Sequence, residues 1–235
     1  MDEQQRVESI ANWYLVEQQE IDKKIIYYRY LSLRPWLVGK DGLELGPAEG
    51  EMTRLLLPHF ERLTVVDGSS ALLDCIPPAP NLRKVHSLFE DFQPAQQFDT
   101  IIGDHILEHV DDPVPLLNSI KQWVGPGGRI IIGVPNADSI HRLAAVKMGL
   151  LKTKDALNDR DRALGHRRVY TRDLLVQHLE QAGLRILTVE GVFFKPVSNA
   201  QIEAHWTPAM IAGFYELGKD FPQYAAELFA VCETP

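Results

Sequence analysis

The chain has 235 residues, 45% of them hydrophobic, which is long enough for one well-buried α/β domain with an elaboration. Its formal net charge of −8 argues against a protein that wraps a nucleic-acid backbone. Cys75 and Cys232 are too few for a disulfide framework, the N-terminus lacks the pattern of a signal peptide, and no apolar run approaches the ~20 residues of a membrane helix. We therefore expect a cytoplasmic protein with no nucleic-acid and no membrane partner.

Residues 4–34 are predicted to form one or two helices, because apolar and aromatic residues recur at near-helical spacing before Pro35. Most of these side chains are expected to pack against a sheet. The alternative is that one polar or aromatic member closes over a bound ligand, since an aromatic face favours a cation and an arginine can pair with a carboxylate. The candidates for that role are Tyr14, Tyr27, Tyr28 and Arg29.

Residues 42–57 predict a strand, a glycine turn and a helix. The apolar run at 42–45 leads to glycines at positions 46 and 50, and the helix at 49–57 is stopped by Pro58. Glycine suits such a turn because a Cβ would hold a ligand away from the backbone. The spacing is Gly-x-Ala-x-Gly and not Gly-x-Gly-x-x-Gly, which argues against a dinucleotide.

The second predicted strand, 62–66, ends at Asp67, which lies 21 residues after Gly46. An acidic side chain at this strand tip can accept hydrogen bonds from both hydroxyls of a ribose. The alternative is that Asp67 only caps the helix that begins near Ser69.

The third predicted strand, 82–85, leads into residues 87–92, where a carboxylate stands between two phenylalanines. Asp91 could accept from the exocyclic amine of an adenine while Phe92 or Phe89 packs on the ring. This loop therefore predicts an adenine site beside the predicted ribose site.

A buried fourth strand, 98–102, runs into Gly103-Asp-His-Ile-Leu-Glu-His-Val110, and Asp111-Asp-Pro113 then opens a helix. Gly125-Pro-Gly-Gly-Arg129 is a turn that feeds a fifth strand ending at Pro135.

Five motifs now stand in order: Glu44-Leu-Gly-Pro-Ala-Glu-Gly50, Val65-Val-Asp-Gly-Ser69, Phe89-Glu-Asp-Phe92, Leu107-Glu-His-Val110 and Gly125-Pro-Gly-Gly-Arg129. This series resembles class I S-adenosylmethionine-dependent methyltransferases of the small-molecule type that includes the ubiquinone-pathway enzymes. The resemblance covers roughly residues 40–135 and continues more weakly through 165–171. Ala48 departs from the pattern, since many members have glycine there.

The resemblance implies S-adenosylmethionine as the cofactor and a Rossmann-like, doubly wound α/β sheet of seven strands whose last strand is antiparallel. It also implies a set of cofactor-binding residues at the strand tips and in the N-terminal cover. These are Tyr28, Glu44, Gly46, Pro47, Ala48, Gly50, Asp67, Gly68, Ser69, Glu90, Asp91, Phe92, Asp104 and His109.

Residues 137–170 carry eight Lys or Arg against four Asp, a local charge of +4 in an acidic chain. One interpretation is a solvated helical insertion. The other is a lid over the methyl acceptor, with Arg142, Arg167 and Arg168 receiving a phosphate or carboxylate, and His141 beside them.

The remaining chain predicts a helix from Thr171 to Gly183, a strand at 184–194, a helical segment at 199–218 and a last strand at 226–232. Its large apolar residues between 195 and 225 are expected to be core or homodimer contacts, with a substrate pocket as the alternative. We expect one domain over 1–235, with a helical cover (1–38), a cofactor-binding core (39–136), the insertion (137–170) and a C-terminal part (171–235).

Methyl transfer needs alignment of nucleophile, carbon and sulfur, and an alcohol acceptor also needs a base. His105 follows the fourth strand directly and is the first candidate, with His166 and Tyr170 approaching from the loop beyond the insertion. No metal is expected, although His105 and His109 are spaced four residues apart.

These features predict an enzyme that methylates oxygen or nitrogen of a small metabolite, with sugars, anionic precursors and secondary metabolites as acceptor classes. The alternative is a cofactor-binding subunit that has lost catalysis and acts in regulation or as a scaffold.

Overall fold

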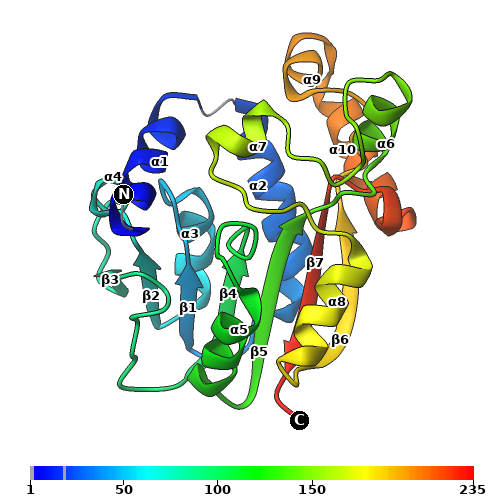
Figure 1. The fold of residues 1–235 in the computed structure, drawn as a ribbon. Coiled ribbons are helices and arrows are strands. Elements are labelled where there is room, and N and C mark those ends of the chain that lie inside the picture. The colour runs from blue at the N-terminus through cyan, green and yellow to red at the C-terminus, as the bar shows by residue number, and fades with distance from the viewer. Residues whose placement is uncertain (1–2, 18–19) are drawn as a thin grey trace.

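A seven-stranded sheet forms the middle layer, with strand order β3-β2-β1-β4-β5-β7-β6 (Figure 1). The computed structural model describes residues 3–17 and 20–235. The strands are β1 (Asp41–Leu45), β2 (Arg62–Asp67), β3 (Leu82–His86), β4 (Phe98–Asp104), β5 (Val124–Pro135), β6 (Arg185–Val192) and β7 (Glu227–Glu233). Strands β1 to β5 are parallel, and β7 runs antiparallel to both β5 and β6. The predicted doubly wound sheet with an antiparallel last strand is confirmed.

Ten α-helices are described. They are α1 (Glu3–Glu17), α2 (Glu20–Leu33), α3 (Glu51–Leu56), α4 (Ser70–Cys75), α5 (Pro113–Trp123), α6 (Ile140–Lys147), α7 (Asp159–Ala163), α8 (Arg172–Gln181), α9 (Asn199–His205) and α10 (Pro208–Asp220). The predicted N-terminal helical cover corresponds to α1 and α2, and the insertion at 137–170 holds α6 and α7. The predicted boundaries between the four parts of the domain stay a prediction.

Two hydrophobic layers cover the two faces of the sheet, because successive strand residues point to opposite sides. Ile101 and Ile130 face α5 and α8, whereas Ile102 and Ile131 face the layer of α2, α3 and α10. Figure 1 shows α5 and α8 on one side of the sheet and α2 on the other.

Two helices start where the sequence predicts them, at Pro113 and after Thr171. Asp112 caps α5 and accepts from the Val114 amide, and Thr171 caps α8 and accepts from the Leu174 amide. The segment predicted as one helix at 199–218 is two helices, α9 and α10. Thr207 and Pro208 separate them, since a residue before proline is disfavoured in the helical region and proline lacks the amide hydrogen.

The large apolar residues of the C-terminal part are mainly packing residues. Tyr215 is buried, and the rings of Trp206 and Phe214 lie 4.4 Å apart between centroids, whereas Met210 is exposed. None of these four side chains lines either of the two cavities described below, which supports the core interpretation over a substrate pocket, and the homodimer stays a prediction. Among residues 3–17 and 20–235, no helix has the length and apolar character that a membrane span requires.

Candidate active site

Two adjoining cavities lie at the carboxyl ends of the parallel strands. Residues of α7 line one of them and residues of α1 line the other. The larger measures about 300 Å³ and the smaller about 110 Å³. Gly46, Ala48 and His105 line both. A ligand that spans the two cavities would therefore cross the glycine turn and the residue that follows β4, where ligands of open α/β sheets bind.

The backbone of this shared wall is in an unusual conformation. Gly46 has φ +70°, and a Cβ on it would lie 2.9 Å from Ile106 Cγ2. Ala48 (φ +46°) and His105 (φ +57°) are also left-handed, at a cost of about 1–2 kcal/mol for each non-glycine residue. The left-handed conformation explains why glycine suits position 48. Ala48 adopts the same conformation in spite of its Cβ, so the turn is constrained.

Asp67 forms the polar end of the smaller cavity. Its carboxylate accepts from the Ser69 amide at 2.8 Å and from the Ala48 amide. Burial raises the pKa of Asp67 to about 6, although both amide hydrogen bonds oppose the rise. Ser69, and not Asp67, is the N-cap of α4. Asp67 thus stays available to a ligand while it also fixes the turn that follows β2.

The opposite wall of the smaller cavity comes from α1 and from the loops after β3 and β4. Arg6, Val7, Phe89, Glu90 and His109 contribute to it. Phe89, one of the two rings predicted to pack on an adenine, lines the smaller cavity, and that role stays a prediction. The ring of Phe92 is instead buried against Trp123, with centroids 5.1 Å apart, and Asp91 is exposed and lines neither cavity.

Two carboxylates at the glycine-turn end of the larger cavity lack a cationic partner among the described residues. Glu44 is 3% exposed and accepts from Thr53 Oγ1 at 2.7 Å, and burial raises its pKa to about 8. Burial also raises the pKa of Glu49, whose Oε1 has no hydrogen-bond partner in the described chain. A cationic ligand group would compensate both carboxylates.

Arg29 and His105 line the larger cavity and bind a shared set of buried carboxylates. Arg29 forms ion pairs with Asp104 and, at 2.8 Å, with Glu227. His105 Nδ1 lies 3.0 Å from Glu108, and its Nε2 lies 3.6 Å from Glu227. Burial and Arg29 disfavour the imidazolium, yet Glu108 and Glu227 together raise the pKa of His105 to about 10. His105 therefore holds its proton at neutral pH.

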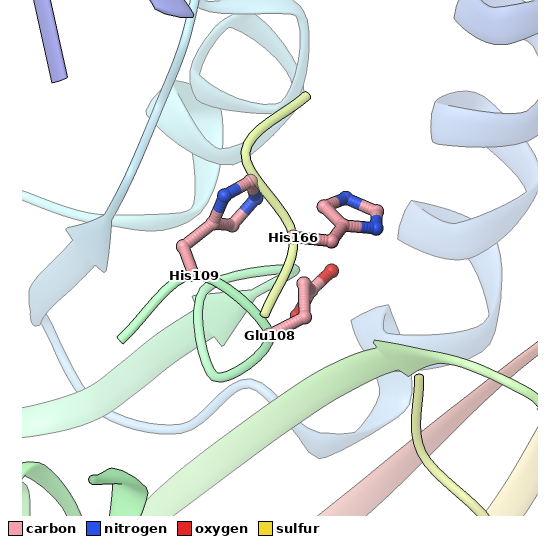
Figure 2. Close-up of side chains that lie close together, drawn as sticks. All are labelled: Glu108, His109 and His166. Atoms are coloured by element: carbon pink, nitrogen blue, oxygen red, sulfur yellow. The ribbon is translucent and has the colours of Figure 1, made fainter. Parts of the chain in front are cut away.

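Figure 2 shows Glu108 close to the imidazoles of His109 and His166. One ligand atom from each lies within 4.8 Å of the others, so these three residues could hold a metal ion. The buried Glu108 carboxylate already has His105 as a cationic partner, and its pKa falls to about 2 because the histidines outweigh burial. Burial lowers the pKa of His109 to about 4. The absence of a required metal stays a prediction.

The far end of the larger cavity is lined by polar residues from four separate segments. His141 and Arg142 come from α6, Arg160 and Asp161 from α7, and Asp22 from α2. Lys195 and Asn199 complete this end after β6.

Comparison with known proteins now decides the family. Residues 23–189 match the model of a methyltransferase domain. The chain belongs to this methyltransferase family. A ubiquinone biosynthesis O-methyltransferase of Coxiella burnetii (strain RSA 331 / Henzerling II) is 26% identical over 181 residues, which cover 73% of this chain and 74% of that protein.

Solved structures share the fold of this methyltransferase. The N-methyltransferase NodS from Bradyrhizobium japonicum WM9, in complex with S-adenosyl-L-homocysteine, aligns with a TM-score of 0.61 at 19% identity over 100% of both chains. A methyltransferase in complex with the Haloferax volcanii Trm112 activator aligns with a TM-score of 0.67 at 15% identity, over 97% of this chain and 98% of that one. The predicted family and enzyme class are confirmed, with S-adenosylmethionine as the methyl donor.

Most of the cofactor-binding residues predicted for this methyltransferase line a cavity. Glu44, Pro47 and Asp104 line the larger one, and Asp67, Gly68, Glu90 and His109 the smaller one, while Gly46 and Ala48 line both. Gly50 and Ser69 line neither. Gly50 has φ +83° ahead of α3, and the Ser69 hydroxyl donates to Glu8 at 2.8 Å, so both support the turns.

Two predicted aromatic site residues lie elsewhere. Tyr28 stacks on Tyr215 with centroids 4.4 Å apart, on a face of α2 that points away from the cavities, whereas the next residue, Arg29, lines the larger one. Tyr170 is fully buried, and its hydroxyl is 3.2 Å from His178 Nδ1. The side chain of Tyr14 lies outside the described residues.

The predicted arginine lid is not arranged as expected. Arg168 donates to the carbonyl oxygens of Leu107, Val110 and Asp111 at 2.6–2.7 Å. Arg167 donates to the His109 carbonyl at 2.8 Å and forms an ion pair with Asp111. Neither arginine lines a cavity. Both guanidinium groups bind the loop after β4 instead.

Arg142 lines the larger cavity, but its guanidinium is committed within the insertion. It lies 3.1 Å from Asp161 and donates to the Lys154 carbonyl at 2.7 Å. Arg142 therefore connects α6 to α7, and its hydrogen bonds leave little of the guanidinium for an acceptor.

Lys195 and Glu227 line the larger cavity, although neither was predicted from the sequence. Lys195 follows the carboxyl end of β6, so the strand-tip rule could have found it. Glu227 begins the antiparallel β7, and its amino end therefore lies at the same edge as the carboxyl ends of the other strands. A rule that examines only carboxyl ends cannot find such a residue.

Proposed function

We propose that this methyltransferase transfers a methyl group from S-adenosylmethionine to an oxygen or nitrogen of a small metabolite held in the larger cavity. The observation that carries the proposal is the pair of cavities joined at Gly46 and His105. One cavity ends in an acidic strand tip, Asp67, and the other has Glu44 without a cationic partner among the described residues. A nucleoside fits the first, and the cationic end of the same molecule fits the second.

S-adenosylmethionine would supply a methyl group bound to a positively charged sulfur, so that a nucleophile attacking the methyl carbon releases the sulfur as the neutral thioether of S-adenosylhomocysteine. The protein's part is to bind, orient and exclude water. Asp67 would accept the ribose hydroxyls, Phe89 would pack on the adenine, and Glu44 and Glu49 would compensate positive charge at the other end.

An oxygen acceptor also has to lose a proton. His105 is poorly suited to receive it, because two carboxylates hold this histidine as a cation. His166 lines the larger cavity, and its Nδ1 lies 3.4 Å from Asp161. We therefore assign His166 as the proton acceptor, oriented by Asp161, and give His105 a positioning role. An amine acceptor that arrives unprotonated needs no such base.

The relatives support both acceptor atoms. The curated relatives are named ubiquinone biosynthesis O-methyltransferases, and NodS is an N-methyltransferase. Sugars, carboxylated or phosphorylated precursors and secondary metabolites stay the acceptor classes that we expect.

The second candidate is a cofactor-binding subunit without catalysis. It is favoured by one observation, the placement of His105, the residue after β4, between the carboxylates of Glu108 and Glu227, which disfavours His105 as a base. A structural neighbour solved in complex with an activator gives an example of this fold working with a protein partner.

The test is transfer of labelled methyl from S-adenosylmethionine to a metabolite panel sorted by charge, with S-adenosylhomocysteine affinity measured by calorimetry. Label in an acceptor supports the enzyme. Tight S-adenosylhomocysteine binding without transfer to any acceptor in a broad panel supports the non-catalytic subunit. No S-adenosylhomocysteine binding would refute both.

A further inference from the structure

The cations that line the larger cavity differ in their partners. They are Arg29, Arg142, Arg160 and Lys195. Each of the three arginines has a carboxylate: Arg29 has Asp104 and Glu227, Arg142 has Asp161, and Arg160 has Asp22. Lys195 forms no ion pair with any residue in the described part of the chain. Its ammonium is therefore the cation of this cavity that a ligand can still compensate.

Lys195 is held in place by a neutral partner. Its Nζ donates to Asn199 Oδ1 at 3.0 Å, and the Asn199 amide donates in turn to Asp22 at 2.6 Å. An ammonium offers three donors, and this contact uses one of them. Glu227 influences Lys195 favourably, but its carboxylate oxygens bind Arg29. The lysine is thus oriented without being neutralised.

A histidine lies beside the same cations. His141 lines the cavity from α6. Burial is the main cause that lowers the pKa of His141 to about 3, and Lys195 and Arg142 act in the same direction. Cations that disfavour an imidazolium also favour an anion near them. Burial lowers the pKa of Lys195 itself, and a bound anion would reverse that effect.

The charged groups of the larger cavity are therefore not fully paired. Glu44, Glu49 and Lys195 form no ion pair among the described residues, although Glu227 and Asp22 are close enough to favour the charge of Lys195. The cationic groups of the methyl donor suit Glu44 and Glu49, which leaves Lys195 for the other reactant.

We propose that Lys195 binds an anionic group of the acceptor, a carboxylate or a phosphate, and so selects acceptors that carry negative charge. This inference rests on the proposed methyl transfer and names its substrate class. The anionic group could also come from the donor itself, because S-adenosylmethionine carries a carboxylate. The experiment separates these two sources.

The experiment is an NMR titration of protein labelled at the lysine Cε, with the Lys195 signal identified by its loss in Lys195→Gln. Protein saturated with S-adenosylhomocysteine is titrated with acetate, inorganic phosphate and acetamide. We expect acetate or phosphate to shift the Lys195 signal and to raise the pKa of Lys195. Acetamide, which has the shape of acetate without its charge, should leave the signal in place.

Two results would overturn the proposal. One is a Lys195 signal that neither anion moves although S-adenosylhomocysteine is bound. The other is a shift on S-adenosylhomocysteine binding alone that abolishes the response to anions, because the donor's carboxylate would then be the partner of Lys195. Failure of S-adenosylhomocysteine to bind at all would instead count against the proposed function.

Kinetics give an independent readout. Lys195→Gln should raise the Michaelis constant of an anionic acceptor about 10- to 100-fold, the usual effect of losing a hydrogen bond to a charged group. The S-adenosylhomocysteine dissociation constant and neutral acceptors should be unaffected. Lys152→Gln is the matched control, since Lys152 is exposed and lies outside both cavities. An unchanged Michaelis constant for anionic acceptors would contradict the proposal.

Discussion

The two ends of the active site are built in different ways. The proposed donor end depends on a backbone turn, with Gly46, Ala48 and His105 in left-handed conformations at the tips of adjacent parallel strands. The acceptor end is made of side chains from α2, α6, α7 and the segment after β6, joined by ion pairs such as Arg160–Asp22. A backbone site tolerates few substitutions, whereas a side-chain site can change its specificity one residue at a time. If the proposed assignment holds, the fold fixes the donor site and leaves the choice of acceptor to local side chains.

The largest effect is expected from Gly46→Val at the donor end. The new side chain would be strained at φ +70° and would meet Ile106, so we expect S-adenosylhomocysteine affinity to fall more than about 100-fold. Gly127→Val is the matched control, because Gly127 has φ +73° with nothing within 4 Å of a Cβ. It should lower the melting temperature and leave the affinity unchanged. Calorimetry and thermal unfolding measure both quantities, and equal affinity in the two variants would contradict a backbone donor site.

Asp67→Asn is expected to weaken S-adenosylhomocysteine binding about 10- to 100-fold, because ribose hydroxyls form stronger hydrogen bonds with a carboxylate than with a neutral amide. Burial raises the pKa of Asp67 to about 6, and Glu8 adds to the rise. Hydroxyl donors prefer the ionised form, so wild-type affinity should be constant above about pH 6 and fall about tenfold per unit below it. The Asn variant should lack this pH dependence, and Asp91→Asn, at an exposed position away from both cavities, should retain it. A flat wild-type profile would remove Asp67 from the site.

The contrast between the two ends also explains what could be predicted from the sequence. The first five strands, the glycine turn and Asp67 follow from contiguous motifs, because each motif carries its own strand and turn, and the arrangement of the sheet followed from the family resemblance. Lys195 and Asn199 join Asp22 only after the chain has folded, across 173 and 177 residues of sequence (195 − 22 and 199 − 22). No local sequence pattern predicts a contact between residues so far apart in the chain.

The arginines of the insertion show a related limit of prediction from sequence. The sequence shows their charges but does not show which acceptors they contact in the folded protein. Arg168 binds three backbone carbonyls of the loop after β4, and Arg142 binds Asp161. Whether a cation is free for a ligand depends on which acceptors the fold brings to it, and this could not be derived from the local charge of +4.

Arg168→Met tests whether these arginines support the loop or bind the acceptor. Loss of its hydrogen bonds to Leu107, Val110 and Asp111 should reduce the free energy of unfolding by about 1–3 kcal/mol. The Michaelis constant of an anionic acceptor should change less than it does in Lys195→Gln. Chemical denaturation and steady-state kinetics measure the two effects. A stable variant with a strongly raised Michaelis constant would restore the lid hypothesis.

His105→Gln tests the positioning role. The pKa of His105 is raised to about 10, so the stability that its ion pairs contribute is complete below the unfolded pKa, about 6.5, and is lost as pH rises through about 10. The variant should lose this alkaline dependence of the free energy of unfolding. Methyl transfer should fall by less than about tenfold, compared with the 10²–10⁴-fold typical for loss of a general base. His166→Gln should show the larger loss with an oxygen acceptor, and the reverse order would return the base role to His105.

Metal removal is expected to have the smallest effect. Glu108, His109 and His166 are close enough to hold an ion, but His105 lies 3.0 Å from Glu108 and already compensates its charge. A divalent ion would have to displace this ion pair, so dialysis against a chelator should leave S-adenosylhomocysteine affinity and methyl transfer unchanged. A loss of transfer that one added metal restores would show that the ion replaces His105 as the partner of Glu108. His166→Ala should then abolish the restoration, and the centre of the active site would have to be assigned to metal chemistry.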